Sequence, residues 1–144
     1  METFNHNQSM LKGISDLSTI GSRIKYYRLL NNFTQEELAD KSGLDRTTII
    51  RYENDLVNHS IDIVDKICKV FEIEPFTIYD DYLKFISDDY GSKIRNLRMD
   101  LGLSQKELGK MLGIHRKTVL KWENKNVFLS RKNYIRLIEF QNCR

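Results

Sequence analysis

Apolar residues recur at steps of three and four along most of this chain, the spacing that places side chains on one face of an α-helix. A single Pro and seven Gly leave little room for an architecture rich in β-turns. The pattern therefore predicts an all-α fold. The expected helices cover 20–30, the stretch between Thr34 and Gly43, and then 46–54, 61–71 and 130–140.

The stretch from Thr34 to Asn54, TQEELADKSGLDRTTIIRYEN, has a second copy 70 positions further along the chain. Residues 21–57 align with 91–127 without a gap, and about a third of the positions are identical. Each copy holds enough apolar residues for a small core of its own, which indicates a duplicated domain. The predicted parts are an N-terminal tail at 1–18, domains at 19–79 and 89–144, and a connecting helix segment at 80–88.

Both copies carry the residue types that begin and end helices. A Thr or Ser followed three residues later by Glu fits a capping box, and a Gly then stands where the helix ends in a left-handed conformation. These residues are Thr34, Glu37, Gly43, Ser104, Glu107 and Gly113. Asp45 is a favourable N-cap for the helix that follows, whereas its counterpart His115 is an unfavourable one. We expect the second helix start to be the less secure of the two.

Pro75 predicts the start of a further helix, since proline is favoured at the first helical position. Apolar residues then continue at steps of three and four in one stripe, Phe76, Tyr79, Leu83, Ile86 and Tyr90. Two uses fit this stripe. It forms a connecting helix that packs both domains into one rigid unit, which is the favoured interpretation, or it presents a surface for a homodimer or protein partner.

Charge is distributed unevenly along the chain, although the net charge is only +3. Residues 91–144 hold 13 Lys and Arg against 4 Asp and Glu, whereas residues 21–79 hold 8 against 10. The second copy therefore carries a positive field that suits a polyanion, and the first copy does not.

A short helix, a turn that includes Gly and a second helix form the arrangement that fits the DNA major groove. Arg46 and Arg116 occupy the first exposed position of the inserted helix, and arginine is the commonest reader of guanine. The predicted DNA contacts are Gln35, Arg46, Thr47, Thr48, Arg51, Gln105, His115, Arg116, Lys117, Thr118 and Lys121. Within this set, Gln35 and Gln105 suit phosphates at a helix N-terminus, and Arg51 and Lys121 suit phosphates one turn further along.

The two copies, TQEELADKSGLDRTTIIRYEN and SQKELGKMLGIHRKTVLKWEN, resemble the lambda-repressor-like (Xre/Cro) helix-turn-helix domains over 19–79 and 89–140. The resemblance implies two tandem five-helix DNA-binding domains. It also implies that the two Gln residues contact phosphates and that the first residues of the third helix read bases. An Arg of the first helix is expected to pair with the Glu that closes the third, as Arg28 with Glu53 and Arg98 with Glu123.

The chain departs from the family pattern in two respects. Asp55 and Lys125 stand where the family often has Gly. The second copy also lacks a segment equivalent to the one that starts at Pro75, so its fifth helix has to come from the connecting helix or from a partner chain.

These features predict sequence-specific binding to double-stranded DNA by a transcriptional regulator, most simply a repressor. The two copies would read two different half-sites about 34 Å apart, one turn of the double helix. In the alternative, the second copy alone binds DNA and the first is a protein-interaction module, for example in an antitoxin. The acidic first half and the stripe from Phe76 to Tyr90 motivate this alternative.

Other classes of protein find little support in the sequence. The three His residues show no metal-ligand spacing, and no nucleophile accompanies the acidic pairs, so we expect no metal, no cofactor and no enzyme. No apolar run approaches the roughly 20 residues of a membrane span. Cys68 and Cys143 form no CxxC motif, which favours free thiols in a cytoplasmic protein.

Overall fold

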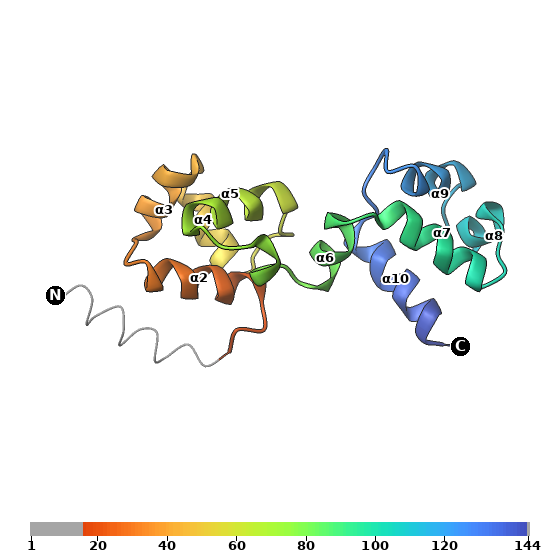
Figure 1. The fold of residues 1–144 in the computed structure, drawn as a ribbon, viewed down its shortest axis with the longest axis horizontal. Coiled ribbons are helices and arrows are strands. Elements are labelled where there is room, and N and C mark those ends of the chain that lie inside the picture. Colours follow the sequence, from red (N-terminus) through yellow and green to blue (C-terminus); the bar gives the residue numbers. More distant parts are fainter. Residues whose placement is uncertain (1–15, 144) are drawn as a thin grey trace. The chain divides into compact units, whose positions relative to one another are not determined.

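The computed structural model describes residues 16–143, which form helices joined by short turns (Figure 1). The all-α fold predicted from the sequence is confirmed for these residues. Most of the predicted tail at 1–18 lies outside them. The elements are α2 (Ile20–Leu30), α3 (Gln35–Ser42), α4 (Arg46–Glu53), α5 (Ile61–Phe71), the 3-10 turn η1 (Pro75–Thr77), α6 (Asp81–Ser87), α7 (Tyr90–Asp100), α8 (Gln105–Leu112), α9 (Arg116–Glu123) and α10 (Arg131–Asn142).

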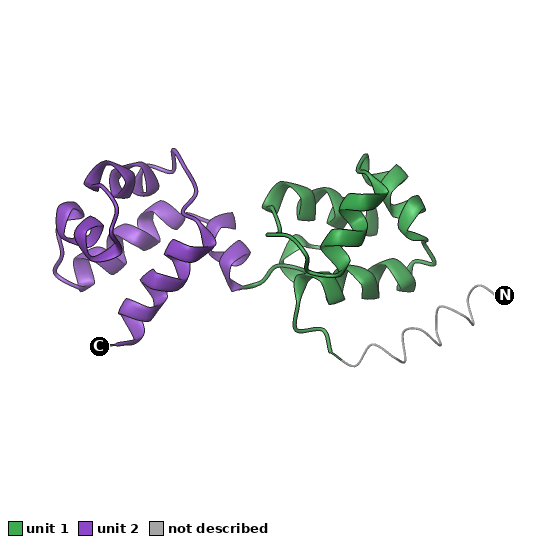
Figure 2. Cartoon of the chain, turned by 180° about the vertical axis from the view of Figure 1, so that it is seen from behind, with its two compact units in different colours: residues 1–80 green, residues 81–144 purple. Residues whose placement is uncertain are grey.

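The helices belong to two compact units that meet in sequence between Asp80 and Asp81 (Figure 2). Unit 1 contains α2 to η1, and unit 2 contains α6 to α10. In each unit the third helix of the copy places two apolar residues in the core. Ile49 and Tyr52 of α4 are buried, as are Val119 and Trp122 of α9. The sequence predicted these four inward positions, and the structure confirms them.

A close backbone approach explains why both copies carry a glycine at the second position of their first helix. A Cβ on Gly21 would lie 2.4 Å from the carbonyl oxygen of Glu53, and one on Gly91 would lie 2.3 Å from that of Glu123. These distances are too short for real atoms, so only glycine lets the first helix start against the end of the third. In unit 1 the Gly21 N–H also donates to the Asp55 carboxylate at 2.9 Å.

A buried ion pair joins the first and third helices of each copy, as the family resemblance implied. In unit 1 the Arg28 Nε donates to the Glu53 Oε2 at 2.6 Å. In unit 2 the Arg98 Nη2 donates to the Glu123 Oε1 at 2.9 Å, and its Nη1 donates to the Leu103 carbonyl at 3.0 Å. Both Glu side chains are almost completely buried, so each pair stabilises the helix arrangement instead of facing a ligand.

The prediction that an α-helix starts at Pro75 is wrong, because Pro75 begins only the 3-10 turn η1 and the next α-helix starts at Asp81. After the 3-10 turn η1 the chain starts α6, and it then starts α7 with Asp89 as the N-cap, whose carboxylate accepts from the Ser92 N–H at 3.3 Å. This cap begins a new helix, so the stripe residues are spread over η1, α6 and α7 although they follow one another at steps of three and four. Among the stripe residues Tyr79, Leu83, Ile86 and Tyr90 are buried, and only Phe76 is exposed. The stripe therefore contributes to the cores and offers little exposed surface for association.

Helix α6 packs within unit 2 on the face of α10. The Tyr82 hydroxyl donates to the Leu129 carbonyl at 2.7 Å. The rings of Tyr82 and Phe85 lie 5.6 and 5.2 Å from the ring of Tyr134 in α10. The connecting segment thus packs within unit 2, against α10 and the Leu129 carbonyl that precedes it.

Candidate nucleic-acid interface

The helix-turn-helix of unit 2 is formed by α8, a short turn and α9. The Ser104 hydroxyl accepts from the Glu107 N–H at 3.0 Å and begins α8. Gly113 ends α8 with a φ of 69°, the left-handed conformation predicted from the sequence. In unit 1 Thr34 and Gly43 play the same parts for α3, and Gly43 has a φ of 72°. Both copies therefore position the start of a second helix directly after a sharp turn.

The N-caps of α4 and α9 are the reverse of what the sequence predicted. Asp45 makes no side-chain cap hydrogen bond to α4. The Nδ1 of His115 accepts from the Lys117 N–H at 3.0 Å and caps α9. The start of α9 is therefore well secured by a residue type that N-cap preferences rank low.

The outward face of α9 carries three of the six predicted DNA contacts of unit 2. Arg116, Lys117 and Lys121 are exposed, together with Leu120. Thr118 is half-buried, because about 100° per residue places it roughly 200° from Arg116 around the helix. The structure therefore brings the three cations together on one face and turns Thr118 away from them.

The corresponding face of α4 in unit 1 has the same layout with fewer charges. Arg46, Thr47 and Arg51 are exposed, and Thr48 is half-buried like its counterpart. Thr47 is the counterpart of Lys117, so the exposed face of α4 has one cation fewer than that of α9.

The two Gln residues predicted as phosphate contacts are already engaged. The Gln105 Nε2 donates to the Glu123 Oε2 at 3.1 Å, and the Gln35 Nε2 donates to the Glu53 Oε1 at 3.3 Å. Each half-buried amide is therefore oriented by the buried carboxylate. An amide nitrogen has two N–H groups, so a second donor is available at the start of each helix beside the backbone N–H groups.

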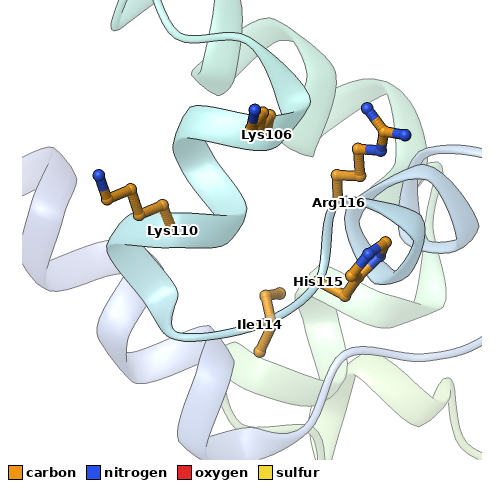
Figure 3. Close-up of a pocket in the computed structure, with 5 residues that line it drawn as sticks. All are labelled: Lys106, Lys110, Ile114, His115 and Arg116. Atoms are coloured by element: carbon orange, nitrogen blue, oxygen red, sulfur yellow. The ribbon is translucent and has the colours of Figure 1, made fainter.

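A cationic cleft of about 420 Å³ lies between α8 and the start of α9. Its lining residues are Lys106, Lys110, Ile114, His115 and Arg116. Figure 3 shows the two lysines on α8, Arg116 at the beginning of α9, and Ile114 in the turn between them. Within residues 16–143 these three cations make no ion pair with an acidic side chain. These three charges are therefore not neutralised by acidic side chains of the described residues.

Sequence reasoning missed Lys106 and Lys110 as members of this site. They are four residues apart on α8, which places them on the same face of the helix. A signal was present in the repeat alignment, since their counterparts in the first copy are Glu36 and Asp40. Because the two copies are otherwise similar, a reversal of charge at these positions indicates that α3 and α8 differ in the charge of what they bind or contact.

The same comparison extends around the whole cleft. Its five lining positions correspond in the first copy to Glu36, Asp40, Leu44, Asp45 and Arg46. Three of the five are acidic in unit 1, whereas none is acidic in unit 2. The two helix-turn-helix motifs thus share a backbone arrangement and differ in the sign of the charge beside the second helix.

A helix-turn-helix with an exposed cationic second helix defines a class of DNA-binding domain, and the comparisons with known proteins identify the family. The Helix-turn-helix family model matches residues 24–78 and 94–140. The chain therefore belongs to the lambda-repressor-like (Xre) helix-turn-helix family, in two tandem copies. This is a family of DNA-binding transcriptional regulators and not of enzymes.

Curated relatives carry the same motif. The chain is 45% identical over 62 residues to an uncharacterized HTH-type transcriptional regulator of Methanocaldococcus jannaschii, covering 42% of this chain and 94% of the relative. A similar regulator of Archaeoglobus fulgidus is 42% identical over 62 residues, covering 42% of this chain and 87% of the relative. The regulator SinR of Bacillus subtilis is 28% identical over 99 residues, covering 65% and 88%. No solved structure gives a significant match.

Two further findings concern the part of the chain that the structure describes. Its helices are too short or too polar to span a lipid bilayer. Its His, Cys, Asp and Glu side chains nowhere gather in a group of three that could hold a metal ion.

Proposed function

We propose that this chain is a sequence-specific regulator of transcription whose unit 2 supplies most of the affinity for double-stranded DNA. The cationic cleft between α8 and α9 carries the proposal. Lys106, Lys110 and Arg116 line it, and within residues 16–143 they form no ion pair. A helix-turn-helix places its second helix, here α9, in the major groove. The major groove is about 12 Å wide and admits one α-helix. The positive field of the second copy supports this assignment.

Each cation of unit 2 has a role that its position favours. Arg116, in the first turn of α9, is suited to donate to the O6 and N7 of guanine, with Lys117 beside it. Lys121, one turn later, is suited to a phosphate. Lys106 and Lys110 border the groove on the α8 side and suit phosphates, which fix the register of the protein on the duplex.

In unit 1 the acidic positions lower the affinity of the same motif for DNA. Glu36, Asp40 and Asp45 would lie beside phosphates if α4 occupied a major groove as α9 does, and like charges repel. Arg46, Thr47 and Arg51 retain the means to contact a second half-site. Unit 1 therefore acts as the weaker reader of a bipartite operator.

A second candidate function concerns unit 1 alone. The acidic residues that replace the cations of the cleft support a role as a protein-interaction module, for example one that joins a regulator to its protein partner. In this case unit 2 is the only reader of DNA, and the operator has a single short motif.

Selection of duplexes from a random pool by the full-length protein, followed by affinity measurements against salt, tests the proposal. We expect the logarithm of the binding constant to fall steeply with the logarithm of the salt concentration. Each phosphate contact should contribute about 0.9 to the magnitude of this slope. Lys106→Ala and Lys110→Ala should each lower the slope by about that amount. The proposal would be refuted if the protein selects no sequence. It would also be refuted if neither lysine substitution changes the salt dependence of binding.

Charge reversal at equivalent positions of the two copies separates the two candidates. Arg116→Glu should weaken binding at least fivefold, since one bidentate contact to guanine contributes about 1–3 kcal/mol. Arg46→Glu should weaken it less and erase only the second half of a bipartite motif. If Arg46→Glu leaves both affinity and selected sequence unchanged, unit 1 is the protein-interaction module. Equal losses from the two substitutions would contradict the dominance of unit 2.

The proposed regulatory outcome is repression, because a protein held in the groove at a promoter obstructs polymerase. A reporter gene with the selected site placed over its promoter should be transcribed less when the protein is present. Increased transcription would contradict repression without affecting the assignment of DNA binding.

A further inference from the structure

Leu120 stands out on the cationic face of α9 because it is a large apolar side chain that the core does not use. It is 43% exposed, whereas its neighbour Val119 is completely buried and Trp122 is 2% exposed. A single exposed leucine is ordinary on a protein surface, so its exposure alone indicates nothing. Its position among the cations is the informative observation.

The helical period places Leu120 in the middle of the face that α9 presents. At about 100° per residue, it lies roughly 40° from Arg116 and 60° from Lys117 around the helix axis. Lys121 borders the same arc on the far side. The exposed arc of α9 is therefore a strip of cations with one apolar side chain at its centre.

The major groove offers one apolar group to such a side chain, the C5 methyl of thymine. We propose that Leu120 is a specificity-determining residue that packs against a thymine methyl while the flanking cations contact guanine and phosphates. This inference rests on the proposed insertion of α9 into the major groove. Leu120 lies about 6 Å along the helix from Arg116, so the thymine falls within about two base-pair steps of the base that Arg116 contacts.

The expected contribution to affinity is small and measurable. When the thymine methyl group is removed, about one carbon is no longer buried against Leu120. This loss corresponds to an increase of about fourfold in the Kd for DNA. The effect should occur at one position of the half-site of unit 2, because α9 carries Leu120 once.

A deoxyuridine scan of the selected operator tests the inference with the full-length protein. Each thymine is replaced in turn by deoxyuridine, which removes the methyl group and keeps the base pairing. Wild-type protein should lose about fourfold in affinity at one thymine near the base assigned to Arg116. Leu120→Ala should bind more weakly and lose this sensitivity, and its Trp122 emission should show that unit 2 remains folded.

Two matched variants distinguish the role of Leu120 from a general loss of contact. Lys121→Ala, on the next residue of the same face, should weaken binding and lower the salt slope yet keep the sensitivity to deoxyuridine. Ile50→Ala, at the equivalent position of unit 1, should not change the loss of affinity that follows replacement of that thymine by deoxyuridine. Leu120→Met retains an apolar side chain and should retain the sensitivity.

The outcomes separate this inference from the function on which it rests. If the wild-type protein binds no duplex, the proposed function fails and the inference fails with it. If the protein binds a selected sequence and no thymine responds to deoxyuridine, the inference alone is overturned. The same holds if Leu120→Ala folds, binds and remains as sensitive as the wild-type protein.

Discussion

Removal of the Glu123 carboxylate should be one of the most damaging single changes in unit 2. The Glu123 side chain is completely buried and accepts hydrogen bonds from Arg98 at 2.9 and 3.2 Å and from Gln105 at 3.1 Å. Arg95 adds a longer contact at 3.4 Å. In Glu123→Ala all of these donors lose their acceptor at once.

The cost follows from the burial of the charge left behind. The Arg98 side chain is only 15% exposed, and in the variant its guanidinium would keep only the Leu103 carbonyl as an acceptor. An uncompensated charge of this kind costs about 3–5 kcal/mol. A unit of this length has a total free energy of unfolding of about 3–10 kcal/mol. Glu123→Ala should therefore leave unit 2 partly or largely unfolded at room temperature.

Trp122 provides an assay that reports on unit 2 by itself. It is the only tryptophan of the chain and is 2% exposed in the core of unit 2. Its emission shifts to longer wavelength when it meets water, so denaturant titrations followed by tryptophan fluorescence measure the unfolding of this unit. We expect the midpoint for Glu123→Ala to move to much lower denaturant, and the transition to begin without any denaturant.

Two further variants decide whether the stranded charge is the cause. Arg98→Met combined with Glu123→Leu removes both charges and should regain a large part of the lost stability. Glu53→Ala, the equivalent change in unit 1, should lower helical circular dichroism and leave the Trp122 transition in place. If Glu123→Ala lowers the free energy of unfolding of unit 2 by less than about 1 kcal/mol, the reasoning is refuted. Such a small loss would mean that the Arg98 guanidinium becomes solvated in the variant.

Three other predictions concern single positions. Gly91→Ala should cost unit 2 about 1–3 kcal/mol in the Trp122 assay, because the new Cβ would lie 2.3 Å from the Glu123 carbonyl oxygen; an unchanged midpoint would show that α7 moves freely. Lys125→Gly should stabilise unit 2 by roughly 0.5–1 kcal/mol, since Lys125 has a φ of 59°, and a loss of stability would contradict the assignment of strain. Burial, with a smaller effect of Asp65, raises the pKa of the Cys68 thiol from 9.0 to about 12, so a thiol reagent at mildly alkaline pH should label exposed Cys143 and spare Cys68 until unit 1 unfolds. Because this pKa is higher in the folded chain, unit 1 should also lose stability as the pH rises from about 9 toward 12, and pH-independent unfolding over that range would contradict the shift.

Much of the local structure could be predicted from the sequence because short-range chemistry determines it. A Thr hydroxyl reaches an N–H three residues away whatever the rest of the chain does, so the start of α3 at Thr34 was correct. Gly43 and Gly113 end their helices in the left-handed conformation for an equally local reason. The positive φ of Lys125 explains why the family often has Gly at this position; nothing in the structure explains the lysine found in this chain.

Contacts between elements could be predicted only where the repeat or the family resemblance supplied them. The family resemblance implied the pairing of Arg28 with Glu53 and of Arg98 with Glu123, and both pairs are present. The orientation of Gln105 toward the same buried carboxylate was not predicted, because it depends on where α8 lies relative to α9.

By itself the sequence determined that the chain is all-α, that it holds two copies of one motif, and that the second copy is strongly basic. Periodicity, caps and composition are local or additive properties, so no packing has to be known to read them. Only the tertiary structure decided that the segment from Pro75 breaks into separate elements and that α6 joins unit 2. It alone also showed that Lys106, Lys110 and Arg116 line one cleft. These features depend on which helices pack together, and packing is a long-range property that spacing along the chain does not specify.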